Sequence, residues 1–229
     1  METLFELANR VATSSVLFSD NESPFSAIVH PGKDKVLLIT GENASGKSVF
    51  FQVMAARAKR DAGMLGIQIS IRERTGAGTY EGSGFRRAVM FGDESEQSTG
   101  ATSVAVVKAG FGNSYQYAKD GKSNMLMLDE PELGLSAGYA KAMGAYLGQQ
   151  AGRMHKNAGG LVVVTHSRDL VRGLLGVGIS PSFANLDPTF QSLQEWLGCD
   201  ENRTVDDLLS LTDIGHQRAA QVRKLIKKR

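Results

Sequence analysis

One stretch of this chain decides the expected fold, and it reads Val36-Leu37-Leu38-Ile39-Thr40-Gly41-Glu42-Asn43-Ala44-Ser45-Gly46-Lys47-Ser48. Its first five residues form a short, mostly apolar run rich in β-forming residues, which favours a buried strand. The next eight residues, called the glycine loop below, fit the phosphate-binding pattern G-x-x-x-x-G-K-[ST] at every fixed position. A helix is expected from about Lys47 to Ala62, where Gly63 is well placed to end it.

The residue types of the glycine loop suit a bound phosphate chain. Glycines let the backbone curl, so that successive N–H groups face inward and form a nest for an anion. The helix that begins near Lys47 adds the partial positive charge of its N-terminus. We expect all eight loop residues to contact ATP, with Lys47 reaching the β- and γ-phosphates and the Ser48 hydroxyl binding Mg²⁺. Phe51, in the first turn of the helix, is a further candidate contact to the nucleotide.

Strand-like and helix-like segments alternate along the rest of the chain. Apolar runs of strand length occur at Leu65–Ile71, Met125–Leu128 and Leu161–Thr165. This alternation predicts an α/β fold, in which a mostly parallel sheet has helices on both faces. Further helices are expected at Ser103–Gly110, at Ala137–Lys156 and from Ser167 onward, and the Gly-rich residues 72–100 are expected to be mostly loop.

The last forty residues have a different pattern. Asp187-Pro188 is typical of an N-cap followed by proline at the first helical position, and Gly198 is suited to end that helix. The segment Thr204–Asp207 resembles a capping box in which Asp replaces the usual Glu. We therefore predict two parts: residues 1–187 form the α/β domain, and residues 188–229 form a small helical appendix.

Composition narrows the class of protein. The 229 residues are 41% hydrophobic and 22% charged, as in ordinary globular proteins, and no run approaches the roughly 20 apolar residues that span a bilayer. The N-terminus lacks the apolar core of a secretory signal. The single cysteine, Cys199, cannot form a disulfide within the chain, so a reducing, cytoplasmic setting is the expectation.

Two acids follow the second apolar run. Asp129 fits the residue that holds Mg²⁺ opposite Ser48, and Glu130 is expected to point to the other side of the extended chain. There Glu130 would orient and deprotonate the water that attacks the γ-phosphate of ATP. The alternative is an ordinary acidic turn at the end of a strand, which the complete glycine loop makes less attractive.

A resemblance to ABC-type ATPases rests on two strings, Asp129-Glu130-Pro131-Glu132-Leu133-Gly134-Leu135-Ser136 and Val162-Val163-Val164-Thr165-His166-Ser167. The first is similar to the Walker B segment and D-loop of the soluble RecF, SMC and OLD-like members. The second is similar to their next strand, with its switch histidine. The resemblance implies an ATP-hydrolysing head domain with Lys47, Glu130 and His166 in the catalytic site. It also implies that His166 donates to the γ-phosphate, and that ATP joins two copies head to tail.

Three parts of that resemblance have weaker support in the sequence. Ser98 and Gly100 are the best candidates for the signature motif that contacts the partner's nucleotide, although a simple polar loop remains the alternative. Gln68 is the candidate for the glutamine that bridges Mg²⁺ and the attacking water. Phe18 and Phe25 are unsupported candidates for stacking on adenine.

The C-terminal segment is basic. Residues 214–229 contain six of the 26 Lys and Arg residues and no acid, so the rest of the chain is mildly acidic. Contact with nucleic acid, contact with an acidic protein partner, and a solvated helix remain open.

The sequence is consistent with two alternative functions. The first is a soluble ATPase that acts with a partner on nucleic acid. The alternative is the nucleotide-binding subunit of a membrane transporter. A P-loop kinase is disfavoured, because Glu130 and His166 form the pattern of a hydrolase.

Overall fold

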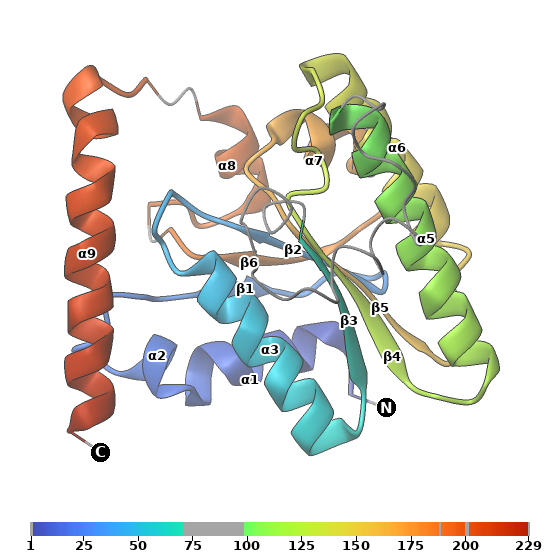
Figure 1. Ribbon diagram of the computed structural model, residues 1–229, viewed down its shortest axis with the longest axis horizontal. Coiled ribbons are helices and arrows are strands. Elements are labelled where there is room, and N and C mark those ends of the chain that lie inside the picture. The colour runs from blue at the N-terminus through green and yellow to red at the C-terminus, as the bar shows by residue number, and fades with distance from the viewer. Residues whose placement is uncertain (1, 71–98, 188, 200–201, 229) are drawn as a thin grey trace, which may run out of the picture.

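The protein has an α/β architecture built on one six-stranded sheet (Figure 1). The computed structural model describes residues 2–70, 99–187, 189–199 and 202–228. The strands follow the order β1-β6-β2-β5-β4-β3; β1 is antiparallel to β6, and all other neighbours are parallel. Their bounds are Ile28–His30 (β1), Val36–Thr40 (β2), Leu65–Ser70 (β3), Asn124–Asp129 (β4), Ala158–Val164 (β5) and Ser182–Asn185 (β6).

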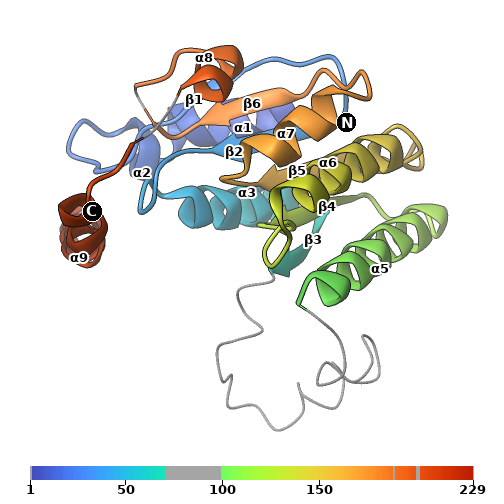
Figure 2. The same ribbon diagram turned by 90° about the horizontal axis from the view of Figure 1, so that it is seen from above.

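Helices cover both faces of the sheet, which gives three layers (Figure 2). On one face the helices are α1 (Leu4–Ser14) and α3 (Lys47–Ala62). The other face is covered by α5 (Thr99–Lys119), α6 (Ala137–Ala151) and α7 (Arg168–Leu175). The remaining helices are α2 (Val16–Ser19), α8 (Leu193–Gly198) and α9 (Val205–Lys227).

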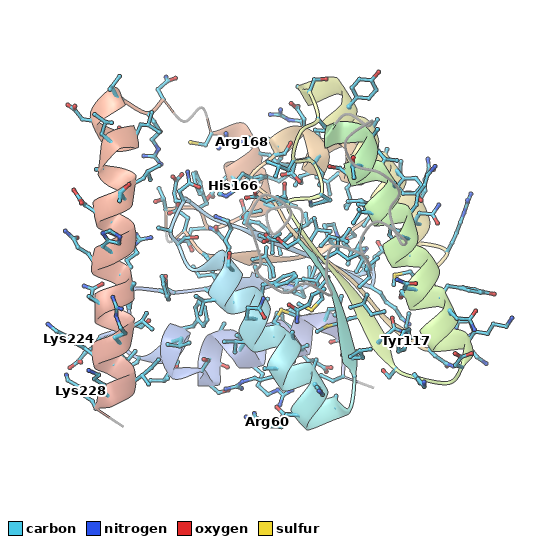
Figure 3. All side chains as sticks on the ribbon, in the orientation of Figure 1. Arg60, Tyr117, His166, Arg168, Lys224 and Lys228 are labelled. Carbon is cyan, nitrogen blue, oxygen red and sulfur yellow. The ribbon has the colours of Figure 1, made fainter. Side chains whose placement is uncertain are left out.

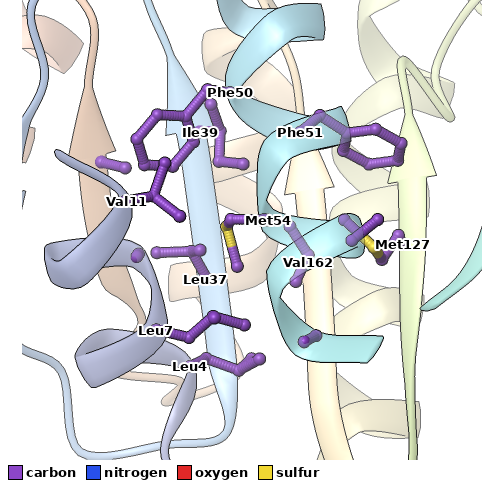
Figure 4. Packing of buried hydrophobic residues seen from close by; sticks show 14 of the residues in the cluster. Leu4, Leu7, Val11, Leu37, Ile39, Phe50, Phe51, Met54, Met127 and Val162 are labelled. Atoms are coloured by element: carbon purple, nitrogen blue, oxygen red, sulfur yellow. The ribbon is translucent and has the colours of Figure 1, made fainter. Parts of the chain in front are cut away.

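The central strand β2 is buried on both sides, as its apolar run requires. Because side chains alternate along a strand, Leu37 and Ile39 pack toward α1 and α3, whereas Leu38 packs toward α6 and α7. Figure 4 shows the first of these layers, in which Leu7 of α1 and Met54 of α3 lie over β2. This packing fixes the strand that leads into the glycine loop.

The predicted α/β architecture with a mostly parallel sheet is confirmed. Helix α3 spans the predicted residues, and Gly63 ends it in the left-handed conformation with φ of 59°. The predicted capping box of α9 is also present: the N–H of Asp207 donates to Oγ1 of Thr204 at 3.2 Å, and the N–H of Thr204 donates to Oδ2 of Asp207 at 2.8 Å.

Several element bounds differ from the prediction. Helix α5 has 21 residues and extends well beyond the predicted Ser103–Gly110, since Phe111 packs against the buried cluster on this face and Ala118 is also buried. Strands β1 and β6 were not predicted. They are only three and four residues long, and pairing with each other and with β2 defines them more than their own composition does.

The predicted helix start at Asp187-Pro188 is wrong, because α8 begins at Leu193 and Ser192 is its N-cap. The carboxylate of Asp187 instead accepts the N–H of Thr189 at 2.9 Å, which makes a local turn. Trp196 of α8 joins the same buried cluster as Leu38 of the sheet. The proposed boundary after residue 187 stays a prediction.

No helix among the described residues is long and apolar enough to cross a membrane.

Close packing between α6 and α7 yields a test of this fold. A Cβ added at Gly144 would overlap the backbone carbonyl of Leu170, whereas one added at the exposed Gly112 of α5 would meet nothing within 4 Å. We expect Gly144→Ala to lower the free energy of unfolding by about 1–3 kcal/mol, as overpacking does. Gly112→Ala, the control, should raise it by about 0.5–1 kcal/mol. Urea unfolding measures both, and equal effects of the two changes would contradict this packing.

Candidate functional site

The candidate site lies where the parallel strands end. Strand β5 is inserted between β2 and β4, and Ile39, Val164 and Asp129 lie in register across them. The segments that follow these strands therefore emerge side by side at one edge of the sheet. This edge is where ligands bind in open parallel sheets. His166 thus comes between the glycine loop and Glu130.

The glycine loop has the backbone conformation that a phosphate nest needs. Gly41, Ala44 and Gly46 have positive φ angles of 147°, 61° and 95°. Gly46 begins α3 without a side-chain cap, so no side chain competes with a ligand for that helix end. A Cβ at Gly46 would lie 2.8 Å from the ring of Phe25, so this ring packs directly against the loop.

Lys47 is held against the loop that it belongs to. Its side chain is almost fully buried, and Nζ donates to the backbone carbonyls of Gly41 at 2.8 Å and Glu42 at 2.7 Å. An ammonium group is costly to bury unless it is hydrogen-bonded. These two bonds meet that need, and they place a positive charge at the cavity described below.

Glu130 has a strained backbone. Its φ angle is 51°. It also precedes Pro131, and helical conformations are disfavoured for a residue that comes directly before proline. The expectation of an extended chain at this residue is therefore wrong. Glu130 and Ala44 are the two non-glycine residues with positive φ in the described part of the chain, and both lie at the candidate site. Such strain costs on the order of 1–3 kcal/mol and clusters at functional sites.

The side chain of Glu130 pairs with His166. Oε1 of this buried glutamate lies 3.2 Å from Nε2 of His166. A neutral imidazole has one N–H donor, and donation to Glu130 leaves Nδ1 as an acceptor. His166 can therefore donate to a phosphate only when it is protonated or has turned away from Glu130. Figure 3 shows His166 near the end of the sheet.

A cavity of about 510 Å³ opens above the glycine loop. This volume lies within the range of about 300–1,000 Å³ that is usual for small-molecule sites. The loop and the start of α3 line one side, and α9 lines another, a position for this helix that the sequence did not predict. The lining residues are Phe25, Asn43, Ala44, Ser45, Gly46, Lys47, Ser48, Val49, His166, Gly215, Arg218, Ala219, Val222 and Arg223.

A hydrogen-bonded group beside His166 was missed by sequence reasoning. Oγ1 of Thr165 donates to Oε1 of Glu132 at 2.5 Å and accepts the N–H of Ser167 at 2.9 Å. Oε2 of Glu132 is buried with no hydrogen-bond partner among the described residues. Burial raises the pKa of Glu132, the Thr165 hydrogen bond opposes that rise, and the nearby Glu130 charge adds to it.

The two expected metal ligands are positioned differently. Ser48 is exposed and lines the cavity. Asp129 is half-buried at the end of β4, where Oγ of Ser70 donates to its Oδ2 at 3.4 Å. By strand alternation Asp129 lies on the same face as Met127, which is the face that α3 covers. Both groups are hard oxygen donors of the kind that Mg²⁺ prefers.

The structure does not bring every candidate to the cavity. Phe51 is 3% exposed and packs in the core beneath α3, as Figure 4 shows, and Phe18 packs there on Phe50. Gln68 lies inside edge strand β3, opposite Met127 and two residues before the strand ends.

Gly100, one of the two signature candidates, is not among the residues that line the cavity of its own chain. Ser98 lies outside the described residues. At Gly100, near the start of α5, an added Cβ would approach Leu135 at 2.8 Å and the carbonyl of Gly134 at 3.2 Å. Gly100 thus packs against the segment that follows Glu130.

Comparisons of the chain with protein-family models, with curated proteins and with solved structures gave no match.

The buried carboxyl of Glu132 generates a pH prediction. Because its pKa is raised in the folded protein, its contribution to stability is present below the ordinary pKa of Glu and is lost as the pH rises through the raised value. We expect Glu132→Gln, which cannot ionise, to gain stability relative to wild type as the pH rises from the ordinary pKa of Glu through the range in which Glu132 ionises in the folded protein. Urea unfolding across that range measures the difference, and a difference that is constant with pH would contradict the assignment.

Proposed function

We propose that this protein binds MgATP in the cavity above the glycine loop and hydrolyses it to ADP and phosphate. The observation that carries the proposal is the pairing of Glu130 with His166 beside a glycine loop that holds Lys47. Binding of MgATP without hydrolysis would need only the glycine loop. A strained, buried carboxylate adjacent to the same cavity is costly to maintain and suits a catalytic base.

Binding of the phosphate chain would rely on the glycine loop. Its positive-φ residues and the uncapped start of α3 supply inward N–H groups and a partial positive charge. Nζ of Lys47 would exchange its carbonyl contacts for phosphate oxygens, which as anions accept the stronger hydrogen bond. Bound nucleotide should therefore rearrange the lysine with little motion of the backbone.

Mg²⁺ fits the donors at this edge of the sheet. The Ser48 hydroxyl and the Asp129 carboxylate would hold it, and when bound it would supply neutralising charge to the phosphate oxygens. Gln68 is not needed for this assignment.

The hydrolytic step requires a base for water. Glu130 would take a proton from water as the water oxygen bonds to the γ-phosphorus and the bond to the bridging oxygen of ADP breaks. His166 holds Oε1 of Glu130 in place before the reaction, and once turned or protonated it would donate to the γ-phosphate. The resemblance of residues 129–136 and 162–167 to ABC-type heads supports the same roles.

The first test concerns binding. Lys47→Ala should abolish tight binding of MgATP, because the phosphate chain loses its main cationic partner in the loop. Lys119→Ala, at the far end of α5, is the control and should bind normally. Calorimetry on folded protein decides, and unchanged affinity in Lys47→Ala would refute the assigned nucleotide site.

The second test concerns chemistry. Glu130→Gln keeps the shape of the side chain but removes the base, so ATP turnover should fall by about 10²–10⁴-fold while MgATP affinity is preserved. Phosphate release and calorimetry on the same preparation separate the two effects. Hydrolysis at the wild-type rate would exclude Glu130 as the base.

A further inference from the structure

Helix α9 forms the wall of the cavity that faces the glycine loop. Its lining residues Gly215, Arg218, Ala219 and Val222 recur every three or four positions, so they share one face of the helix. Two of them are small, which leaves room between the helix and the loop. Figure 1 shows α9 standing beside α2 and the N-terminal end of α3, far in sequence from the loop that it faces.

Contacts along its length hold α9 in this position. Just before the helix, Nη2 of Arg203 lies 2.7 Å from Oε1 of Glu42 in the glycine loop itself. Near the other end, Nζ of Lys228 lies 2.5 Å from Oε2 of Glu22. Exposed ion pairs stabilise little by themselves. Leu225, which is buried, and Val222, which packs against the core cluster, add apolar contact.

The cavity that results is electropositive. Its lining includes the cations Lys47, Arg218 and Arg223, and none of the lining residues in the described part of the chain is acidic. The nearby acid of the loop, Glu42, is neutralised by Arg203. An anion fits this arrangement far better than a neutral ligand or a cation.

Arg218 is the basic residue of α9 best placed to contact that anion. It is half-buried and lies where the cavity meets a neighbouring groove of about 290 Å³, and Asn43 of the loop lines both. It makes no hydrogen bond or ion pair with any described residue, unlike Arg203 and Lys228 of the same segment. A guanidinium group offers five donors in a fork that matches phosphate oxygens.

We propose that α9 closes the nucleotide site within the same chain and that Arg218 binds the phosphate chain of the nucleotide from the side opposite Lys47. This inference rests on the proposed ATP site. The resemblance to ABC-type heads implies that residues 98–100 of a second copy contact the nucleotide from this side. Our proposal gives that role to α9 of the same chain. The charge of the C-terminal segment then serves nucleotide binding at Arg218, while the exposed Lys224 and Lys227 remain open to solvent.

The test compares two charge-removing changes on the same helix. Arg218→Met keeps an unbranched apolar stem and removes the charge, and Lys224→Met does the same at an exposed residue, which Figure 3 labels. Affinity for the Mg²⁺ complex of AMPPNP, a non-hydrolysable ATP analogue, is measured by calorimetry at low and high salt. We expect Arg218→Met to lose about 10- to 100-fold in affinity and to show a weaker salt dependence, while Lys224→Met binds as wild type does.

The controls separate this inference from the proposed function. If wild-type protein does not bind the analogue, the nucleotide site itself is refuted. If wild type binds and Arg218→Met binds equally well, or if Lys224→Met loses as much as Arg218→Met, the role of Arg218 is refuted and the nucleotide site stands. Thermal unfolding without nucleotide should be the same for Arg218→Met and wild type, because Arg218 has no partner to lose within the described residues. Wild-type affinity that rises with protein concentration would show closure by a second copy and overturn closure within the chain.

Discussion

The parallel pairing of β5 between β2 and β4 is the constraint on which the candidate site depends. Parallel register forces the carboxyl ends of neighbouring strands to the same edge of a sheet. Three segments that are far apart in the sequence therefore meet: the glycine loop at residues 41–48, Glu130 and His166. A shift of one residue in any of these strands would move each side chain to the opposite face of the sheet, where it would meet the wrong apolar layer. The two layers that cover the sheet therefore also fix the site.

The site contains features that are costly in themselves. Glu130 and Ala44 have left-handed backbones, Lys47 is buried, and the carboxyl of Glu132 has one oxygen without a partner among the described residues. Such features persist only where the surrounding structure determines them. Here that structure is the core in which β2 and β5 are buried on both sides. The stability of the core is thus linked directly to the chemistry at its edge.

The position of helix α9 shows where the basic residues of the C-terminal segment lie. In the sequence its basic residues form a run that leaves contact with nucleic acid, contact with an acidic protein and a solvated helix open. In the structure these basic residues point to different surroundings. Arg218 and Arg223 line the cavity. Lys228 pairs with Glu22, and Lys224 is exposed. A helix separates residues by 100° per position, so one run of charge can serve several surfaces.

By itself, the sequence determined the α/β class and the strand and helix around the glycine loop, because these follow from local periodicity. It also predicted a phosphate site at residues 41–48, from a motif whose residues are adjacent in the chain. Only the tertiary structure decided that Phe51 packs in the core, that Glu132 and Thr165 support the site, and that α9 lies over the glycine loop. These depend on contacts between segments far apart in sequence. The direction in which a side chain points is set by what its element packs against, which no local pattern contains.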